Sequence, residues 1–214
     1  EIILGASPHK GGKGWFSALA RYDTFLILRQ YMGLASWGFS YMAVGRNLAF
    51  TRQFFDKSRG YRSHLDLPSG DDDLLVNENM FKAKTGVVFN QQALTFSAPK
   101  QNFLSWTYQK MRHTMTFGRY NLASKLLLLF LGLIRISPAL LLISLLFLKV
   151  GEAPLILLIF ISTLAVVSFI RFRLARYLGD DILGFMSLLL SIGLTFLYPA
   201  AVVFHWWKKQ EWKK

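Results

Sequence analysis

The chain has 214 residues, of which 53% are hydrophobic, and it carries a formal net charge of +13. Its mean hydropathy of +0.33 is too high for an ordinary soluble domain, and its long apolar segments exclude a soluble nucleic-acid binder despite the basic charge. The chain has no cysteine, which excludes a disulfide framework and a thiolate metal site.

The apolar residues are concentrated in the second half of the chain. Residues 1–121 are mixed and rich in aromatic side chains, whereas residues 122–214 consist mostly of long aliphatic runs. We predict a surface-lying or soluble domain followed by a membrane domain. The Lys and Arg residues flank apolar segments, which fits anionic lipid headgroups and phosphorylated substrates.

The first fifty residues alternate between extended and helical patterns. Residues 1–4 resemble a strand, residues 7–14 form a glycine-rich loop, and residues 15–34 have the apolar spacing of a helix that packs on a sheet or lies at a membrane surface. We favour packing. Residues 39–50 form an extended apolar run that Gly45-Arg46-Asn47 interrupts. The glycine would let the backbone approach a ligand closely, and a simple β-bulge explains the interruption equally well.

Three consecutive carboxylates follow a predicted short helix over residues 51–59. Asp71, Asp72 and Asp73 stand behind a Pro-Ser-Gly turn and ahead of an apolar run, so we expect them in the first turn of a helix that reaches about Lys84. One interpretation is an acid-rich helix start, which the helix dipole favours. The other is a functional site, because adjacent carboxylates repel unless a cation, a proton or a substrate hydroxyl shares the site.

A basic amphipathic helix is predicted over residues 100–116, after short strands over residues 86–89 and 93–96. Its side chains at i, i+3 and i+4 share one face; they are Gln109, Arg112 and His113. These donors suit a phosphate or diphosphate. The alternative is a basic face that contacts lipid headgroups.

Three apolar segments are candidates for membrane spans, over residues 126–148, 154–170 and 182–207. Three arginines follow the second segment; they are Arg171, Arg173 and Arg176. The positive-inside rule places that loop in the cytoplasm, together with residues 1–121.

Three motifs, in order, resemble those of membrane-bound family 2 glycosyltransferases, the group of hyaluronan, cellulose and chitin synthases. Gly-Asp-Asp-Asp-Leu-Leu-Val-Asn over residues 70–77 resembles the acidic catalytic motif of that group. Gln-Lys-Met-Arg-His over residues 109–113 resembles its Gln-x-x-Arg-Trp motif, with histidine in place of tryptophan. Residues 45–52 resemble its acceptor-side segment.

The resemblance implies a fold class of α/β plus membrane α-helical: a partial GT-A-type (nucleotide-diphospho-sugar transferase) domain over residues 1–121, followed by about three transmembrane helices over residues 122–214. It implies that Asp72 is the general base of an inverting transfer and that Asp71 positions the acceptor or the base. The donor diphosphate would be bound by Gln109, Arg112 and His113. The acceptor side would include Gly45, Arg46, Asn47 and Asp73.

The implied partners are a nucleotide-sugar donor, a lipid or glycan acceptor and a membrane, without nucleic acid. A divalent metal, Mg or Mn, is expected in the full-length enzyme, but the family's Asp-x-Asp ligands have no counterpart here. We therefore expect a C-terminal part of a longer enzyme, inactive alone, in a bacterial inner (plasma) membrane with the catalytic domain cytoplasmic. The alternative is a non-catalytic membrane anchor or transport component with a basic interfacial domain.

Overall fold

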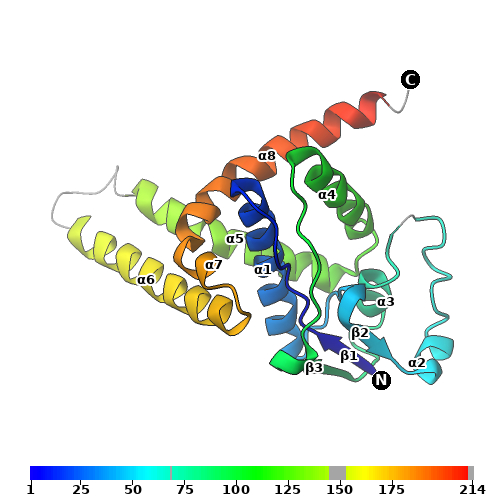
Figure 1. Ribbon diagram of the computed structural model, residues 1–214. Helices are drawn as coiled ribbons and strands as arrows, with labels where there is room; N and C mark the ends of the chain where they lie inside the picture. Colours follow the sequence, from blue (N-terminus) through cyan, green and yellow to red (C-terminus); the bar gives the residue numbers. More distant parts are fainter. Residues whose placement is uncertain (68, 145–152, 212–214) are drawn as a thin grey trace. The chain divides into compact units, whose positions relative to one another are not determined.

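The computed structural model describes residues 1–67, 69–144 and 153–211 (Figure 1). The chain divides into two compact units. The first contains Glu1–Asn121 and Leu188–Lys214, and the second contains Leu122–Ser187. The last helix therefore belongs with the predicted catalytic domain and not with the other two apolar segments.

A three-stranded sheet lies in the first unit, in the order β2-β1-β3. The central strand is β1 (Ile2–Gly5), which pairs parallel with β3 (Thr85–Val88) and antiparallel with β2 (Leu48–Phe50) (Figure 1). Ile2 and Leu4 are buried while Ile3 is exposed, as the two-residue period of a strand requires. The predicted strands over residues 1–4 and 86–89 are confirmed to within a residue.

The helix α1 (Trp15–Ser36) packs against the sheet. It follows the predicted loop, and its buried face supplies much of the core of this unit. The hydroxyl of Tyr31 donates to the carbonyl oxygen of Gly5 at 2.9 Å, which fixes the helix on the end of β1. The predicted helix and its packing role are therefore confirmed.

The helix expected after the acidic motif differs from the prediction at both ends: of the three carboxylates, only Asp73 lies in its first turn, and the helix is shorter than predicted. The helix α3 covers only Asp73–Glu78, with Asp72 as its N-cap, and it does not continue to Lys84. Asn79 ends it, because this side chain donates back to the carbonyl oxygen of Leu75 at 2.9 Å.

Residues 93–96 do not form a strand. A short 3-10 helix, η2 (Gln91–Ala93), occupies the start of this segment. The chain beyond it makes isolated hydrogen bonds with the loop after β1, one of them from the Thr95 amide to the Ala6 carbonyl at 3.3 Å. These single contacts do not build a ladder.

Three further elements complete residues 45–117. The 3-10 helix η1 (Gly45–Asn47) interrupts the extended run where the interruption was expected. The helix α2 (Arg52–Lys57) is capped by Thr51, and α4 (Phe103–Phe117) is capped by Asn102. Both helices were predicted with slightly longer bounds.

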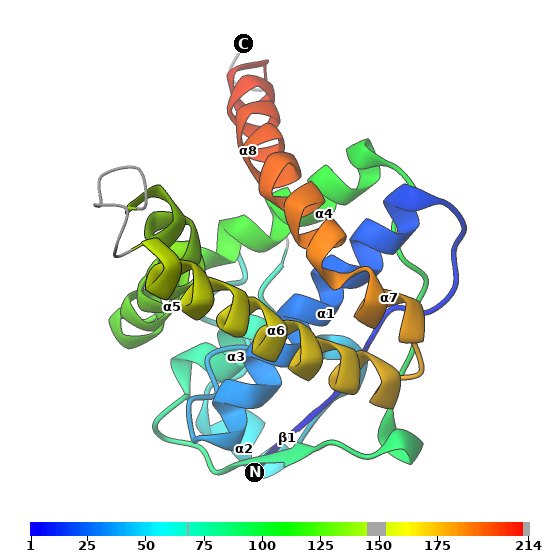
Figure 2. The same ribbon diagram turned by 90° about the vertical axis from the view of Figure 1, so that its left-hand side faces the viewer.

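The helix α8 (Ser187–Glu211) lies beside α4, as Figures 1 and 2 both show. The ring centroids of Phe103 and Phe204 are 6.2 Å apart. The predicted single segment over residues 182–207 is instead divided at Met186, because α7 (Asp181–Phe185) starts from its own cap at Asp180 and ends before α8 begins.

The second unit contains α5 (Leu122–Ser144), α6 (Ala153–Tyr177) and α7. Gly184 of α7 packs against Phe172 of α6, where an added Cβ would lie 2.9 Å from the Phe172 Cα. Part of the first predicted span, residues 145–148, lies outside the described residues. Among the described helices, one is long and apolar enough to cross a membrane, over the 24 residues Pro154–Tyr177.

Candidate functional site

The carboxylate of Asp72 is held by two backbone amides from different parts of the chain. Its Oδ2 accepts from the Gly45 N–H at 2.7 Å, and its Oδ1 accepts from the Asp73 N–H at 2.8 Å. A Cβ at Gly45 would lie 3.3 Å from Oδ2, so a side chain there would crowd the carboxylate. The acidic motif and the Gly45-Arg46-Asn47 segment, 27 residues apart, therefore meet at this group.

Burial raises the pKa of Asp72 above its ordinary value, and the charges of Asp73 and Asp71 add to the effect. The hydrogen bonds from Gly45 and Asp73 act in the opposite direction, because they stabilise the charged form. Asp72 is only partly buried. A carboxylate has about four lone-pair sites, so each of its oxygens can accept a further hydrogen bond from a bound hydroxyl.

Asp73 turns into the protein and is only 4% exposed. Its Oδ1 accepts from the Leu74 amide at 2.8 Å, and its Oδ2 accepts from the hydroxyls of Thr116 at 2.5 Å and Tyr120 at 2.8 Å. Asp73 therefore joins α3 to the C-terminal end of α4. The sequence did not reveal this role, and the assignment of Asp73 to the acceptor side stays a prediction.

Asp71 is exposed, on the solvent side of the same turn. The phenol of Tyr61 lies within the field of this turn, since the charges of Asp71 and Asp72 add to desolvation in raising the pKa of Tyr61. Tyr61 was missed by sequence reasoning, because it precedes the acidic motif in a stretch without periodic pattern.

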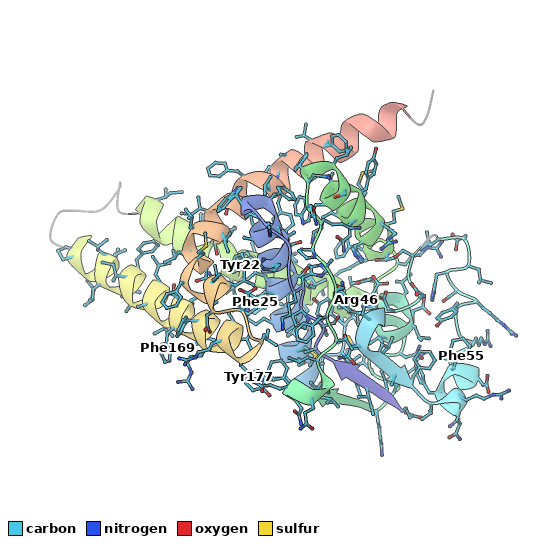
Figure 3. All side chains as sticks on the ribbon, viewed as in Figure 1. Tyr22, Phe25, Arg46, Phe55, Phe169 and Tyr177 are labelled. Carbon is cyan, nitrogen blue, oxygen red and sulfur yellow. The ribbon has the colours of Figure 1, made fainter. Side chains whose placement is uncertain are left out.

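Arg46, which is labelled in Figure 3, connects the loop after β1 with the segment after η2. Its Nε donates to the Ser7 hydroxyl at 3.0 Å, its Nη2 to the Ser7 carbonyl oxygen at 3.1 Å, and its Nη1 to the Ser97 hydroxyl at 2.7 Å. Desolvation lowers the pKa of Arg46, while Tyr31 and Asp72 act to raise it. The guanidinium is thus positioned at the carboxyl end of the parallel strands.

His9 belongs to the same polar network and is buried, with 7% of its surface exposed. Its Nδ1 lies 2.8 Å from the Ser97 hydroxyl oxygen. Desolvation, followed by the charge of Arg46, lowers the pKa of His9 to about 4. His9 is therefore neutral at physiological pH, and its isolated position in the glycine-rich loop gave no signal of this network.

Asn47 has a connecting role. Its Nδ2 donates to the carbonyl oxygens of Ala6 and Ala93, both at 2.8 Å. The side chain fills the space beside Gly5, where an added Cβ would lie 2.3 Å from the Asn47 Cγ. Asn47 therefore holds η1 against the loop that follows β1.

The helix α4 carries Gln109, Arg112 and His113 at the predicted i, i+3, i+4 spacing. Gln109 is half-buried and the other two are exposed. Within residues 1–67, 69–144 and 153–211, the side chains of Gln109 and Arg112 make no hydrogen bond or ion pair, which leaves their donors open to a ligand.

The ring of His113 is electrostatically coupled to the acidic turn. Packing of protein atoms and the charge of Lys110 lower the pKa of His113, while the carboxylates of Asp72 and Asp73 act to raise it. His113, on the predicted diphosphate-binding face, therefore lies within the electric field of Asp72, the predicted base. The acidic motif and the Gln109–His113 motif are separated by 36 residues in the sequence, counted from Asp73 to Gln109.

The described side chains do not by themselves form a cluster of metal ligands. Among the described residues, no group of three or more His, Asp or Glu side chains could hold a metal ion. Asp73 is engaged by Thr116 and Tyr120, and Asp72 by backbone amides. The expected Mg or Mn ion stays a prediction for the full-length enzyme.

Comparison with known proteins adds no relative: no protein-family model matches the chain, and searches of curated proteins and of solved structures find no match.

Proposed function

We propose that this chain is the acceptor-and-base part of an inverting, membrane-bound glycosyltransferase of the family 2 type. It would transfer a sugar from a nucleotide-sugar donor to a hydroxyl of a lipid-linked or polysaccharide acceptor. The observation that carries the proposal is the Asp72 carboxylate, held by the Gly45 and Asp73 amides and electrostatically coupled to His113 on the helix of Gln109 and Arg112.

Asp72 suits a general base in three respects. Two backbone hydrogen bonds fix its orientation, its oxygens retain lone pairs for a substrate hydroxyl, and its pKa is raised toward the range in which a carboxylate accepts a proton effectively. In the proposed step, the acceptor oxygen forms a bond to the anomeric carbon and its proton passes to Asp72. The bond from that carbon to the diphosphate oxygen breaks, and the configuration inverts.

The departing nucleoside diphosphate gains negative charge, so donors placed beside it lower the barrier. Arg112 and Gln109 are the side chains proposed for this role, because their donors are open and they share a face of α4. His113 is proposed to contact the same diphosphate, because its ring lies within the field of Asp72. The acceptor side is proposed to include Gly45, Arg46 and Asn47.

A membrane location supports a lipid-linked or growing glycan acceptor. The helix α6 is long and apolar enough to cross a membrane, and its C-terminal turns carry Arg171, Arg173 and Arg176. By the positive-inside rule this end faces the cytoplasm. We propose that the catalytic unit lies on that side, in a bacterial inner membrane.

The experiment measures release of nucleoside diphosphate by the full-length gene product in membranes, with a panel of nucleotide sugars and Mg²⁺ or Mn²⁺. Wild type is compared with Asp72→Asn and with a control, Asp56→Asn. Asp56 is exposed and forms an ion pair with Arg52 on the surface of α2, at 3.7 Å. The proposal predicts that one sugar is turned over by wild type and by Asp56→Asn, but not by Asp72→Asn.

Equal turnover by Asp72→Asn and the control would refute the base assignment. If no nucleotide sugar is turned over by wild type, the transferase proposal fails and the anchor or transport interpretation replaces it. Membrane fractionation of all three proteins confirms that each one is inserted.

A further inference from the structure

A second buried carboxylate, Asp23, lies on α1 and is 2% exposed. Its Oδ2 accepts from the indole Nε1 of Trp106 at 2.9 Å and forms an ion pair with the Lys110 ammonium. Its Oδ1 accepts from the hydroxyl of Tyr198. Trp106 and Lys110 belong to α4 and Tyr198 belongs to α8, so one carboxylate joins three helices.

The partners of Asp23 also contact one another. The Lys110 ammonium lies 5.5 Å from the Trp106 ring centroid and 5.8 Å from that of Tyr198, and its side chain is only 17% exposed. The two aromatic rings are 5.7 Å apart. Separating Lys110 from Asp23 would leave an enclosed charge without its partner, which is strongly destabilising. The pair therefore favours the one arrangement of α1 and α4 in which the two side chains meet.

The contacts of Trp106 and Lys110 with Asp23 place one face of α4 against α1. Lys110 faces inward to Asp23. Because an α-helix has 3.6 residues per turn, the direction of Lys110 also sets the directions of Gln109, Arg112 and His113 on the same helix. At the other end of α4, Thr116 donates to Asp73. Two buried carboxylates therefore fix the helix that presents the proposed diphosphate-binding face.

The apolar helix α8 is seated on α1 by further contacts. The Tyr22 hydroxyl, on the residue before Asp23 (Figure 3), lies 2.7 Å from the Ser191 hydroxyl oxygen. Gly193 lies so close to α1 that an added Cβ would be 3.0 Å from Leu19 Cδ2. On its other side, α8 exposes Ile192, Phe196 and Val203.

We propose that Asp23 is a positioning residue for the transfer reaction. With Lys110 and Tyr198, it couples the seating of α8 to the orientation of Gln109, Arg112 and His113 on α4, and so sets the affinity of the site for the leaving diphosphate. This inference rests on the proposed function.

The test compares Asp23→Asn with two controls in the full-length protein in membranes. Asp56→Asn makes the same chemical change at an exposed site. Tyr22→Phe removes a hydroxyl contact between α1 and α8 and leaves the hydrogen-bonding groups of Asp23, Trp106 and Lys110 in place. The readouts are kcat/KM for the nucleotide sugar and inhibition by its nucleoside diphosphate.

We expect Asp23→Asn to lower kcat/KM and weaken product inhibition by about tenfold or more, since a displacement of about 1 Å in a catalytic site costs up to 10²-fold. Asp56→Asn should keep the values of wild type. Tyr22→Phe weakens one contact of α8 but keeps the ion pair between Asp23 and Lys110, so it should lose clearly less than Asp23→Asn. If Asp23→Asn matches Asp56→Asn, or if Tyr22→Phe loses as much as Asp23→Asn at the same loss of thermal stability, the positioning role is overturned. Tyr198→Phe, which removes one donor only, replaces Asp23→Asn if that protein fails to insert.

A second readout does not depend on catalysis. Cysteines replace Tyr108 on α4 and Phe204 on α8, whose ring centroids are 6.2 Å apart, and a short bis-maleimide joins them; the 214 residues contain no other cysteine. We expect Asp23→Asn to slow this cross-link several-fold, whereas Asp56→Asn leaves it unchanged. An unchanged rate in Asp23→Asn would overturn the coupling of α4 to α8. If the wild-type protein turns over no nucleotide sugar, the proposed function fails, and the catalytic part of this inference fails with it. The cross-linking rate alone then decides whether Asp23 holds α4 and α8 together.

Discussion

The hydrogen bond between Tyr120 and Asp73 gives a sharp prediction about stability. The Tyr120 hydroxyl donates to Asp73 Oδ2 at 2.8 Å, and burial together with the Asp73 charge raises the pKa of Tyr120, which keeps the phenol protonated. Tyr120→Phe keeps the ring in contact with Phe117, at a centroid distance of 5.7 Å, so no cavity forms. What is lost is one hydrogen bond to a buried charge, which contributes about 2 kcal/mol.

This loss corresponds to a fall of about 4–8 °C in the thermal midpoint of a chain of this size. The assay follows intrinsic fluorescence of the purified protein in lipid nanodiscs at one fixed heating rate. Tyr108→Phe is the matched control, because Tyr108 is exposed and its change should stay within about 0.5 kcal/mol. Equal midpoints for the two variants would refute the conclusion that Asp73 ties α3, through Tyr120, to the segment that follows α4.

Three further predictions follow. Asn47→Ala removes the hydrogen bonds to the Ala6 and Ala93 carbonyls, and should cost about 2 kcal/mol in the same thermal assay; no shift would contradict its connecting role. His9 has a folded pKa of about 4 against an ordinary value of 6.5. The unfolded chain therefore binds more protons between these pH values, and the free energy of unfolding should fall by up to about 3 kcal/mol as the pH drops through that window. His9→Gln should make the thermal midpoint less dependent on pH, and an equally steep dependence in that variant would contradict the burial of a neutral ring. Since the pKa of Asp72 is raised above 3.8, the acid limb of kcat/KM should lie above that pH in a pH–rate profile, and a limb at or below it would contradict the desolvated base.

The sequence predicted those elements whose pattern is local. The apolar spacing over residues 15–34 identified α1, and the i, i+3, i+4 spacing on α4 placed Gln109, Arg112 and His113 on one face. Both depend only on helical periodicity. The position of the break at residues 45–47 was likewise visible, because glycine interrupts an extended apolar run.

The parts that were not predicted depend on contacts between distant residues. The length of α3 is set by Asn79, whose side chain competes for a helix carbonyl. Asp73 was grouped with Asp71 and Asp72 by adjacency, yet a rotation of about 100° per helical residue turns it toward Thr116 and Tyr120.

Asp23 shows the same limit more strongly. In the sequence it is a single acid in an apolar helix, and its partners Trp106, Lys110 and Tyr198 are 83 to 175 residues away. The packing of α8 with the first unit also follows from tertiary contacts. Hydropathy alone does not distinguish such a helix from a membrane span.

The central claim is that Asp72 removes the proton from the acceptor, and the most direct measurement separates binding from transfer in the Asp72→Asn protein. Donor affinity is measured by displacement of a labelled nucleoside diphosphate from the membranes, and transfer by incorporation of labelled sugar, with Asp56→Asn in parallel. Our account predicts that Asp72→Asn lowers transfer by about 10²–10⁴-fold, the usual contribution of a general base, while donor affinity stays equal to that of the control. Transfer at the rate of the control, or a loss of transfer matched by an equal loss of donor affinity, would contradict it.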